Sequence, residues 1–236
     1  MKSLEILSYN IEFGKKLDDV TAWITQEKLL PDVFCFQEFP EDRISFFEKF
    51  LSQKGYAYTY ARGIMLRGVQ IGELTAHKKG LRLLESKQLS LGNHLWERRY
   101  KDAKGQRSAL VTAYRYEDTV FTVANIHLSM LSPHSMRYKQ LQIVISELER
   151  FSENALIIGD FNYTSLLGVS RLFKFMTKYG FTCVGERLIT HRIFKHIPQQ
   201  LDYLFQKGFV PKHITVLKVP HSDHLPLYVK LAVQNA

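Results

Sequence analysis

Polar side chains able to bind metal ions or transfer protons recur at or beside the ends of the predicted strands. This placement indicates a functional site, because ligand sites in open α/β sheets are built where strands end. The residues concerned are Asn10, Glu38, His127, Asp160, Asn162, Asp202, Asp223 and His224.

The types of these residues point to one kind of chemistry. Hard oxygen donors are carried by Asn10, Glu38, Asp160, Asn162 and Asp223. Without cysteine ligands, such donors select Mg²⁺ or Mn²⁺ over zinc or copper, although Mg²⁺ usually binds only one or two carboxylates directly. The two histidines could transfer protons or stabilise charge beside a phosphate, and Asp202 could fix the tautomer of one of them.

Each residue also has a structural interpretation, which is the commoner one when the residue is taken alone. Asp160 or Asn162 could cap a helix that begins near Ser165, since an Asn or Asp after a strand is more often a turn former or cap than a ligand. Glu38 could be a cap or a solvated charge, and His127 a hydrogen-bonded structural histidine. Independent caps, however, have no reason to follow the motif order of one family.

The elements that must position these residues alternate along the chain. Hydrophobic spacing predicts helices over residues 17–30, 41–53, 134–151 and 166–179. Strands are predicted over residues 4–9, 33–36, 56–60, 81–84, 108–116, 120–126 and 155–158, and near 181–184, 201–205, 214–218 and 226–232. With no linker or repeat between them, this pattern favours one α/β domain over residues 1–236.

Composition narrows the class of protein. The chain has 236 residues, of which 45% are hydrophobic, and a formal net charge of +9. The charge favours polyanionic partners, although a solvated basic surface explains it almost as well. Two cysteines are too few for a disulfide framework or a four-ligand zinc site. Because no secretory pattern or membrane-length apolar stretch is found, we expect a soluble cytoplasmic protein.

Six short motifs together resemble the endonuclease/exonuclease/phosphatase superfamily. They are Ser8-Tyr9-Asn10-Ile11, Phe36-Gln37-Glu38, Asn125-Ile126-His127-Leu128, Gly159-Asp160-Phe161-Asn162, Leu201-Asp202-Tyr203 and Ser222-Asp223-His224-Leu225-Pro226. The motifs follow the order of that superfamily, and the match runs from residue 8 to about residue 232. The resemblance implies a DNase I-like four-layer sandwich, in which two packed mixed β-sheets are flanked by helices.

The resemblance also implies a role for each residue. Asn10, Glu38 and Asp223 would line a Mg²⁺ site, with Glu38 as the principal ligand and Mn²⁺ as a substitute. Asp160 would orient or deprotonate the attacking water, and Asn162 would hold the phosphate. His224, paired with Asp202, and His127 would act on the phosphate as acid, base or charge stabiliser. Arg107, in Gln106-Arg107-Ser108, would contact the phosphate.

The substrate is less well defined. Gln37-Glu38-Phe39-Pro40 and Gln200-Leu201-Asp202-Tyr203 differ from the motifs of abasic-site endonucleases and inositol phosphatases, respectively. The basic charge favours a nuclease or DNA phosphodiesterase, for which residues 56–67 and 94–100 supply aromatic and basic side chains. The alternatives are an enzyme acting on a phospholipid head group, inositol phosphate or other small phosphoester, and, ranked last, a non-catalytic binding module. No membrane-docking segment is evident.

Overall fold

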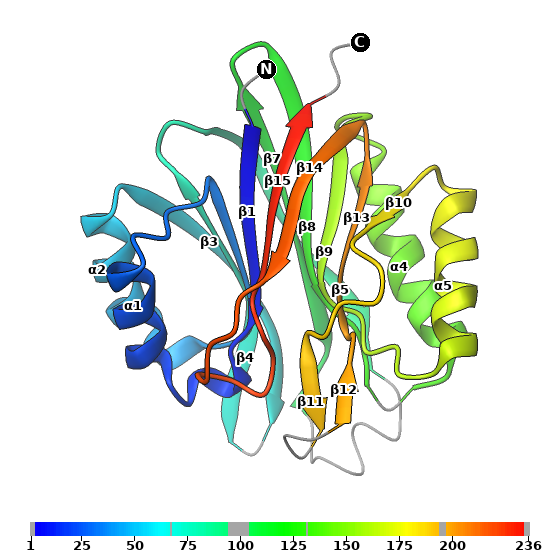
Figure 1. Ribbon diagram of the computed structural model, residues 1–236, viewed down its shortest axis with the longest axis horizontal. Helices are drawn as coiled ribbons and strands as arrows, with labels where there is room; N and C mark the ends of the chain where they lie inside the picture. Colours follow the sequence, from blue (N-terminus) through cyan, green and yellow to red (C-terminus); the bar gives the residue numbers. More distant parts are fainter. Residues whose placement is uncertain (1–2, 67, 94–103, 131, 194–196, 234–236) are drawn as a thin grey trace.

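The chain forms two β-sheets packed face to face, with helices on both outer faces (Figure 1). The computed structural model describes residues 3–66, 68–93, 104–130, 132–193 and 197–233. The first sheet has the order β14 (Phe209–Val216), β15 (Leu227–Val233), β1 (Ser3–Asn10), β2 (Val33–Pro40), β4 (Val69–Lys78), β3 (Tyr56–Leu66) and β6 (Lys104–Gly105). The second has the order β10 (Thr182–Val184), β13 (Asp202–Lys207), β9 (Ala155–Asp160), β8 (Thr119–His127), β7 (Arg107–Tyr116) and β5 (Arg82–Gly92).

The helices complete the four layers. α1 (Leu17–Gln26) and α2 (Ile44–Gln53) cover the first sheet, and α4 (His134–Leu148) and α5 (Leu166–Lys178) cover the second. Short 3-10 turns, η1 (Glu12–Gly14) and η2 (Glu41–Arg43), follow β1 and β2. A small hairpin of β11 (His191–Ile193) and β12 (Ile197–Gln199) lies at one end of the sandwich. This arrangement confirms the predicted DNase I-like sandwich.

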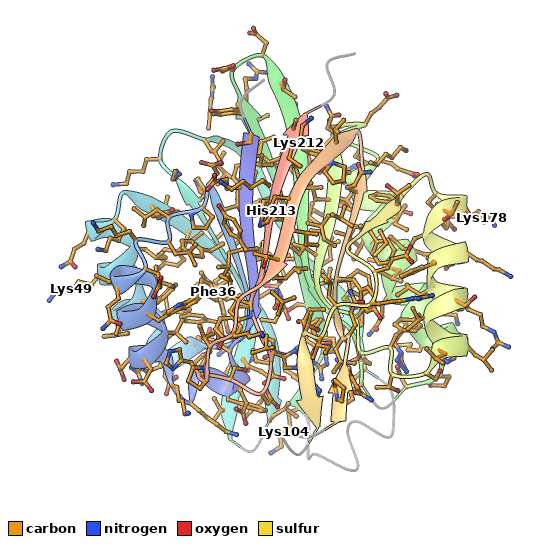
Figure 2. The ribbon with its side chains drawn as sticks, in the orientation of Figure 1. Phe36, Lys49, Lys104, Lys178, Lys212 and His213 are labelled. Carbon is orange, nitrogen blue, oxygen red and sulfur yellow. The ribbon has the colours of Figure 1, made fainter. Side chains whose placement is uncertain are left out.

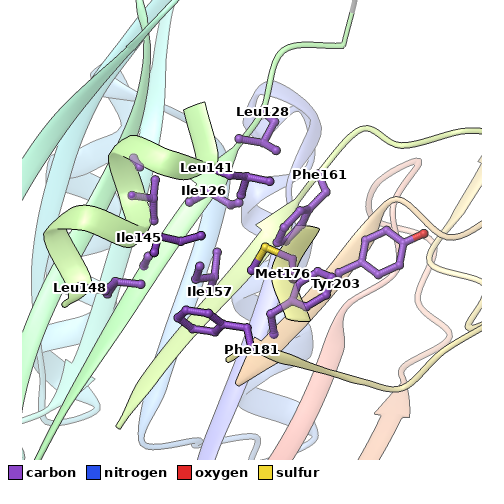
Figure 3. Packing of buried hydrophobic residues seen from close by; sticks show 14 of the residues in the cluster. Ile126, Leu128, Leu141, Ile145, Leu148, Ile157, Phe161, Met176, Phe181 and Tyr203 are labelled. Carbon is purple, nitrogen blue, oxygen red and sulfur yellow. The ribbon is translucent and has the colours of Figure 1, made fainter. Parts of the chain in front are cut away.

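Each pair of adjacent layers has its own hydrophobic core. Phe36, Phe47 and Leu51 belong to the core between the first sheet and its helices, whereas Val33 and Leu227 belong to the core between the sheets. The third core joins the second sheet to α4 and α5 (Figure 3). Because β-strand side chains alternate between faces, one strand can supply two of these cores.

Two pairs of parallel strands bring the polar strand ends together. β1 runs parallel to β2, with Asn10 opposite Gln37, and β8 runs parallel to β9, with His127 opposite Asp160. β13 pairs with β9 in the antiparallel sense, so that its first residue, Asp202, also lies opposite Asp160. Asp160 is therefore fixed between His127 and Asp202 by the backbone ladder alone.

A buried amide pair joins the two sheets beneath these strand ends. Gln37 Nε2 donates to Asn125 Oδ1 at 2.7 Å, from β2 to β8. Asn125 Nδ2 lies 3.1 Å from the carbonyl oxygens of both Phe36 and Leu74. Both amide side chains are fully buried. These hydrogen bonds favour one packing arrangement of the two sheets, because a slipped sheet would break them.

Several predicted boundaries were wrong. The first helix ends at Gln26 rather than residue 30, where Lys28 takes a left-handed backbone with φ of 50°. The helix predicted over residues 134–151 ends at Leu148, and the segment 41–53 begins with a 3-10 turn. β4 was missed because Glu73, Thr75 and His77 are buried within it, so it lacks a recognisable apolar face. None of the described helices is long and apolar enough to cross a bilayer.

Candidate active site

A cavity of about 330 Å³ lies at the end of the sandwich where these strand ends meet. Its walls include most of the predicted site residues: Glu38, Arg107, His127, Asp160, Asn162, Asp223 and His224. The other two, Asn10 and Asp202, lie immediately behind the wall and hydrogen-bond to residues that line it. The structure thus brings together the residues that were predicted to catalyse the reaction, bind the metal or contact the phosphate.

Asp160 lies at the centre of the cluster. Its Oδ2 is 3.5 Å from His127 Nε2, 3.6 Å from His224 Nε2 and 3.2 Å from Asn10 Nδ2. Burial raises the pKa of Asp160 to about 7; the positive charge of His224 opposes the rise, and the Asp202 and Glu38 carboxylates add to it. A carboxyl group with such a pKa can accept a proton near neutral pH.

His224 is held by a carboxylate behind it. Its Nδ1 lies 2.8 Å from Asp202 Oδ2, so that Nε2 faces Asp160 and the cavity. Burial alone would lower the pKa of His224, but the charge of Asp202 and its hydrogen bond, together with Asp160 and Asp223, raise it to about 10. An imidazole with such a pKa carries a proton at neutral pH and can donate to an anionic ligand.

Asp223 lines the cavity together with His191, a histidine that the sequence analysis did not single out. His191 Nε2 lies 3.8 Å from Asp223 Oδ2, and Leu225 N–H donates to Thr190 O at 2.6 Å. Burial opposes ionisation of Asp223, but the hydrogen bond from His191 and the charge of His224 lower its pKa to about 2. His191 belongs to no recognisable sequence motif. It reaches the cavity because β11 pairs at this residue with His224, in the loop before β15.

Backbone strain is concentrated around the cavity. Glu12, Phe13, Glu38 and Asn162 all line it, and all have positive φ, between 47° and 58°. Such conformations are costly for residues other than glycine and persist only where the surroundings impose them. At Glu38 the positive φ coincides with the β-bulge between Phe36 and Phe39, and this bulge turns the Glu38 side chain toward the cavity.

The structure gives no support to the capping interpretations. The N-cap of α5 is Ser165, whose Oγ accepts from Gly168 N–H at 3.1 Å. Asp160 instead accepts from Asn162 N–H at 2.9 Å, and Asn162 Nδ2 donates to Leu128 O at 3.0 Å. Glu38 caps neither the 3-10 turn nor the helix that follows it.

Arg137, on α4, holds the segments that follow β8 and β9. Its guanidinium donates to the carbonyl oxygens of Ser132 and Asn162 and lies 4.8 Å from the centre of the Tyr163 ring. On the same helix, Gln140 Oε1 accepts from Ser129 N–H at 3.2 Å. These contacts fix both segments that leave β8 and β9, and thereby the position of Asn162.

The donor set fits a divalent cation of the hard type. Glu38 Oε1 lies 3.8 Å from His127 Nε2, on the same imidazole edge as Asp160, so two carboxylates converge there. A bound cation would relieve the repulsion that helps to raise the pKa of Asp160. Ligand atoms of His191, Asp223 and His224 also lie within 4.8 Å of one another, a second group able to hold a metal ion.

Asn10 is placed less favourably for direct ligation. Its Oδ1 accepts a hydrogen bond from Glu12 N–H at 3.1 Å, and its Nδ2 donates to Asp160. The residue is only 2% exposed. It is well placed to orient Asp160.

The predicted nucleic-acid residues near 56–60 lie elsewhere, since Tyr56 is buried in the core under α2 and Tyr60 packs against that core. Residues 94–100 and Arg67 lie outside the described residues.

The glycine before Asp160 is required sterically. Gly159 has φ of 137°, and a Cβ atom there would lie 2.1 Å from the carbonyl oxygen of Ile126. We expect Gly159→Ala to lower the free energy of unfolding by about 3 kcal/mol, measured by chemical denaturation. Gly80→Ala is the control, since a Cβ there meets nothing within 4 Å. Equal stability of the two variants would contradict the prediction.

Comparison with known proteins identifies the family. The model of the Endonuclease/Exonuclease/phosphatase family matches residues 7–224, and the chain belongs to this family. A UPF0294 protein of Erwinia tasmaniensis is 32% identical over 132 residues, which cover 55% of this chain and 48% of that protein. The match therefore spans about half the length of that curated relative.

Two solved structures illustrate the shared fold. D. rerio TDP2 complexed with single-strand DNA product is 15% identical, with a TM-score of 0.71 over 99% of this chain and 100% of that one. ANGEL2, a 2',3'-cyclic phosphatase in complex with adenosine-2',3'-vanadate, is 17% identical, with a TM-score of 0.77 over 99% of this chain and 96% of that one. These likenesses bear out the predicted fold.

Proposed function

We propose that the protein is a Mg²⁺-dependent nuclease or DNA phosphodiesterase, with Mn²⁺ as a substitute metal. The observation that carries this proposal is the cluster in which Asp160 lies beside both His127 and His224, in the wall of a cavity that Glu38, Asp223 and Arg107 also line. The preference for nucleic acid rests on the net charge of +9 and on the fold shared with TDP2, which has been solved with single-strand DNA product.

Each side chain has a role that follows from its position. Asp160, oriented by Asn10 and by Asn162 N–H, positions a water and takes its proton. His224, held by Asp202, and His127 donate to phosphate oxygens as negative charge develops, and Arg107 adds a fixed positive charge. Glu38 and Asp223 would hold the metal ion, which when bound supplies Lewis-acid stabilisation of the phosphate.

A second candidate function is hydrolysis of a phospholipid head group or a small phosphoester. Two consecutive leucines at the start of α5, Leu166 and Leu167, are 90% and 74% exposed. Leu166 lines a groove that shares Thr164 with the cavity, so an apolar docking surface lies beside the site although the sequence showed none. The phosphatase named among the structural neighbours adds a small phosphoester to the candidates.

A panel of substrates separates the two candidates. Plasmid DNA, single-stranded DNA, RNA, sphingomyelin vesicles and phosphoinositides are incubated with the protein and Mg²⁺, in parallel with Glu38→Gln. We expect cleavage of nucleic acid by the wild type and its loss in the variant, because glutamine keeps the shape of Glu38 without its charge. Cleavage confined to lipid or inositol substrates would refute the nuclease assignment.

A further inference from the structure

The candidate catalytic cavity opens into a groove on each side. The α5 groove, of about 930 Å³, lies between α5 and residues 186–189, 198–200 and 203, and it shares Thr164 and Gln199 with the cavity. The C-terminal-loop groove, of about 650 Å³, is lined by Lys16 and residues of the 218–225 segment, and shares Glu12 and Asp223 with the cavity. Each groove therefore adjoins the cavity that holds the catalytic residues.

The walls of both grooves combine apolar surface with basic residues. Val169, Phe173 and Tyr203 line the α5 groove together with Lys174 and Arg187. In the C-terminal-loop groove the apolar side chains are Val219, Pro220 and Leu225, and the basic ones are Lys16 and Lys218. Glu186 is the acidic residue of the α5 groove, while the acidic residues of the other groove are the two that it shares with the cavity.

This combination fits an unpaired nucleic-acid strand. Bases can reach an apolar wall only when they are not stacked within a duplex, and lysine or arginine beside them neutralises the backbone phosphates. A phospholipid carries one head group and would need an apolar groove on one side only. A groove on each side of the cavity suits a polymer that continues beyond the scissile phosphate in both directions.

We propose that the two grooves bind unpaired nucleotides on either side of the scissile phosphate, so that cleavage occurs within a single strand and not only at its end. This inference rests on the proposed nuclease function. The attacking water loses a proton to Asp160 as its oxygen bonds to phosphorus, and the bond to one ester oxygen breaks as that oxygen takes a proton, which leaves two strand ends, one a phosphate and the other a hydroxyl.

Circular single-stranded DNA tests the inference, because it has no end. With Mg²⁺, we expect the protein to convert the circle to linear and then shorter products, at a rate within about threefold of that for a linear strand of the same sequence. Bis(p-nitrophenyl) phosphate is assayed alongside, since this small diester reaches the cavity without filling the grooves.

Charge reversal in each groove locates the strand. Lys174→Glu and Lys218→Glu remove one exposed cation from the α5 groove and the C-terminal-loop groove, respectively. Lys49→Glu is the control, because Lys49 is exposed on α2, on the opposite side of the molecule from α5 (Figure 2). We expect each groove variant to weaken binding of a fluorescent single strand in EDTA about tenfold, and to lower the magnitude of its salt slope by about 0.7.

The outcomes separate the inference from the proposed function. Cleavage of the circle, with weaker binding in both groove variants but not in Lys49→Glu, supports the inference. Degradation of the linear strand alone would overturn it and leave the nuclease function standing, as would equal effects of all three substitutions on binding. Hydrolysis of the small diester without cleavage of any nucleic acid would overturn both.

Discussion

Replacement of Asp160 by asparagine is expected to lower kcat about 10³-fold on any substrate that the protein cleaves. Asparagine has nearly the same shape and can still accept from Asn162 N–H, but it cannot take a proton from water. Because the side chain is 2% exposed and central to the cluster, no neighbouring carboxylate can replace it without moving. Steady-state kinetics at saturating substrate and Mg²⁺ measure the effect.

The control for this variant is Asp118→Asn. Asp118 is exposed in the turn between β7 and β8, at the opposite end of β8 from His127, and the same chemical change there should leave kcat unaltered. Circular dichroism and unfolding curves establish that both variants are folded. An Asp160→Asn variant with more than a tenth of the wild-type kcat would show that another group handles the proton.

Replacement of Asp202 by asparagine is expected to lower kcat about 10²-fold at pH 8, and by less at pH 6. Burial lowers the pKa of His224, but the Asp202 carboxylate, with smaller contributions from Asp160 and Asp223, raises it to about 10, so the wild-type imidazole stays protonated through the neutral range. Without that charge the pKa falls toward the ordinary value of 6.5. In the variant the protonated imidazole is then retained below about pH 6.5 and lost above it. The loss of kcat relative to the wild type therefore grows as the pH rises.

NMR titration of His224 in the metal-free variant tests the cause directly. The imidazole of the wild type should remain protonated at pH 8, whereas that of Asp202→Asn should titrate at least two units lower than the wild type. A loss of activity that is the same at every pH, with an unchanged His224 titration, would mean that Asp202 acts only by holding the ring in place.

The sequence predicted the architecture because its elements carry local signals. The strands ending at Asn10, His127 and Asp160 are apolar runs followed by polar residues, and the strands predicted over residues 108–116 and 120–126 correspond to β7 and β8. The motif order supplied what periodicity could not, namely that strands distant in the chain meet at one end of the sandwich. The position of Asp160 between His127 and Asp202 then follows from strand register.

The sequence did not reveal features that depend on tertiary contacts. His191 contributes to the site only because β11 pairs with the loop that carries His224, and no local pattern marks it. The metal-site role of Asn10 stays a prediction, and the hydrogen bonds of its amide with Asp160 and with Glu12 N–H were not foreseen. The grooves are formed by side chains from segments far apart in the chain, so they have no signature in any one stretch of sequence.

The most direct test of the central claim, that these residues form one metal-dependent phosphoester-cleaving centre, is the metal dependence of hydrolysis. Protein dialysed against EDTA is assayed on single-stranded DNA and on bis(p-nitrophenyl) phosphate before and after titration with Mg²⁺ or Mn²⁺. The convergence of Glu38, Asp160 and Asp223 on one cavity predicts that activity is lost without metal and restored by either ion, but not in Glu38→Gln. Full activity in EDTA, or restoration in Glu38→Gln equal to that of the wild type, would contradict it.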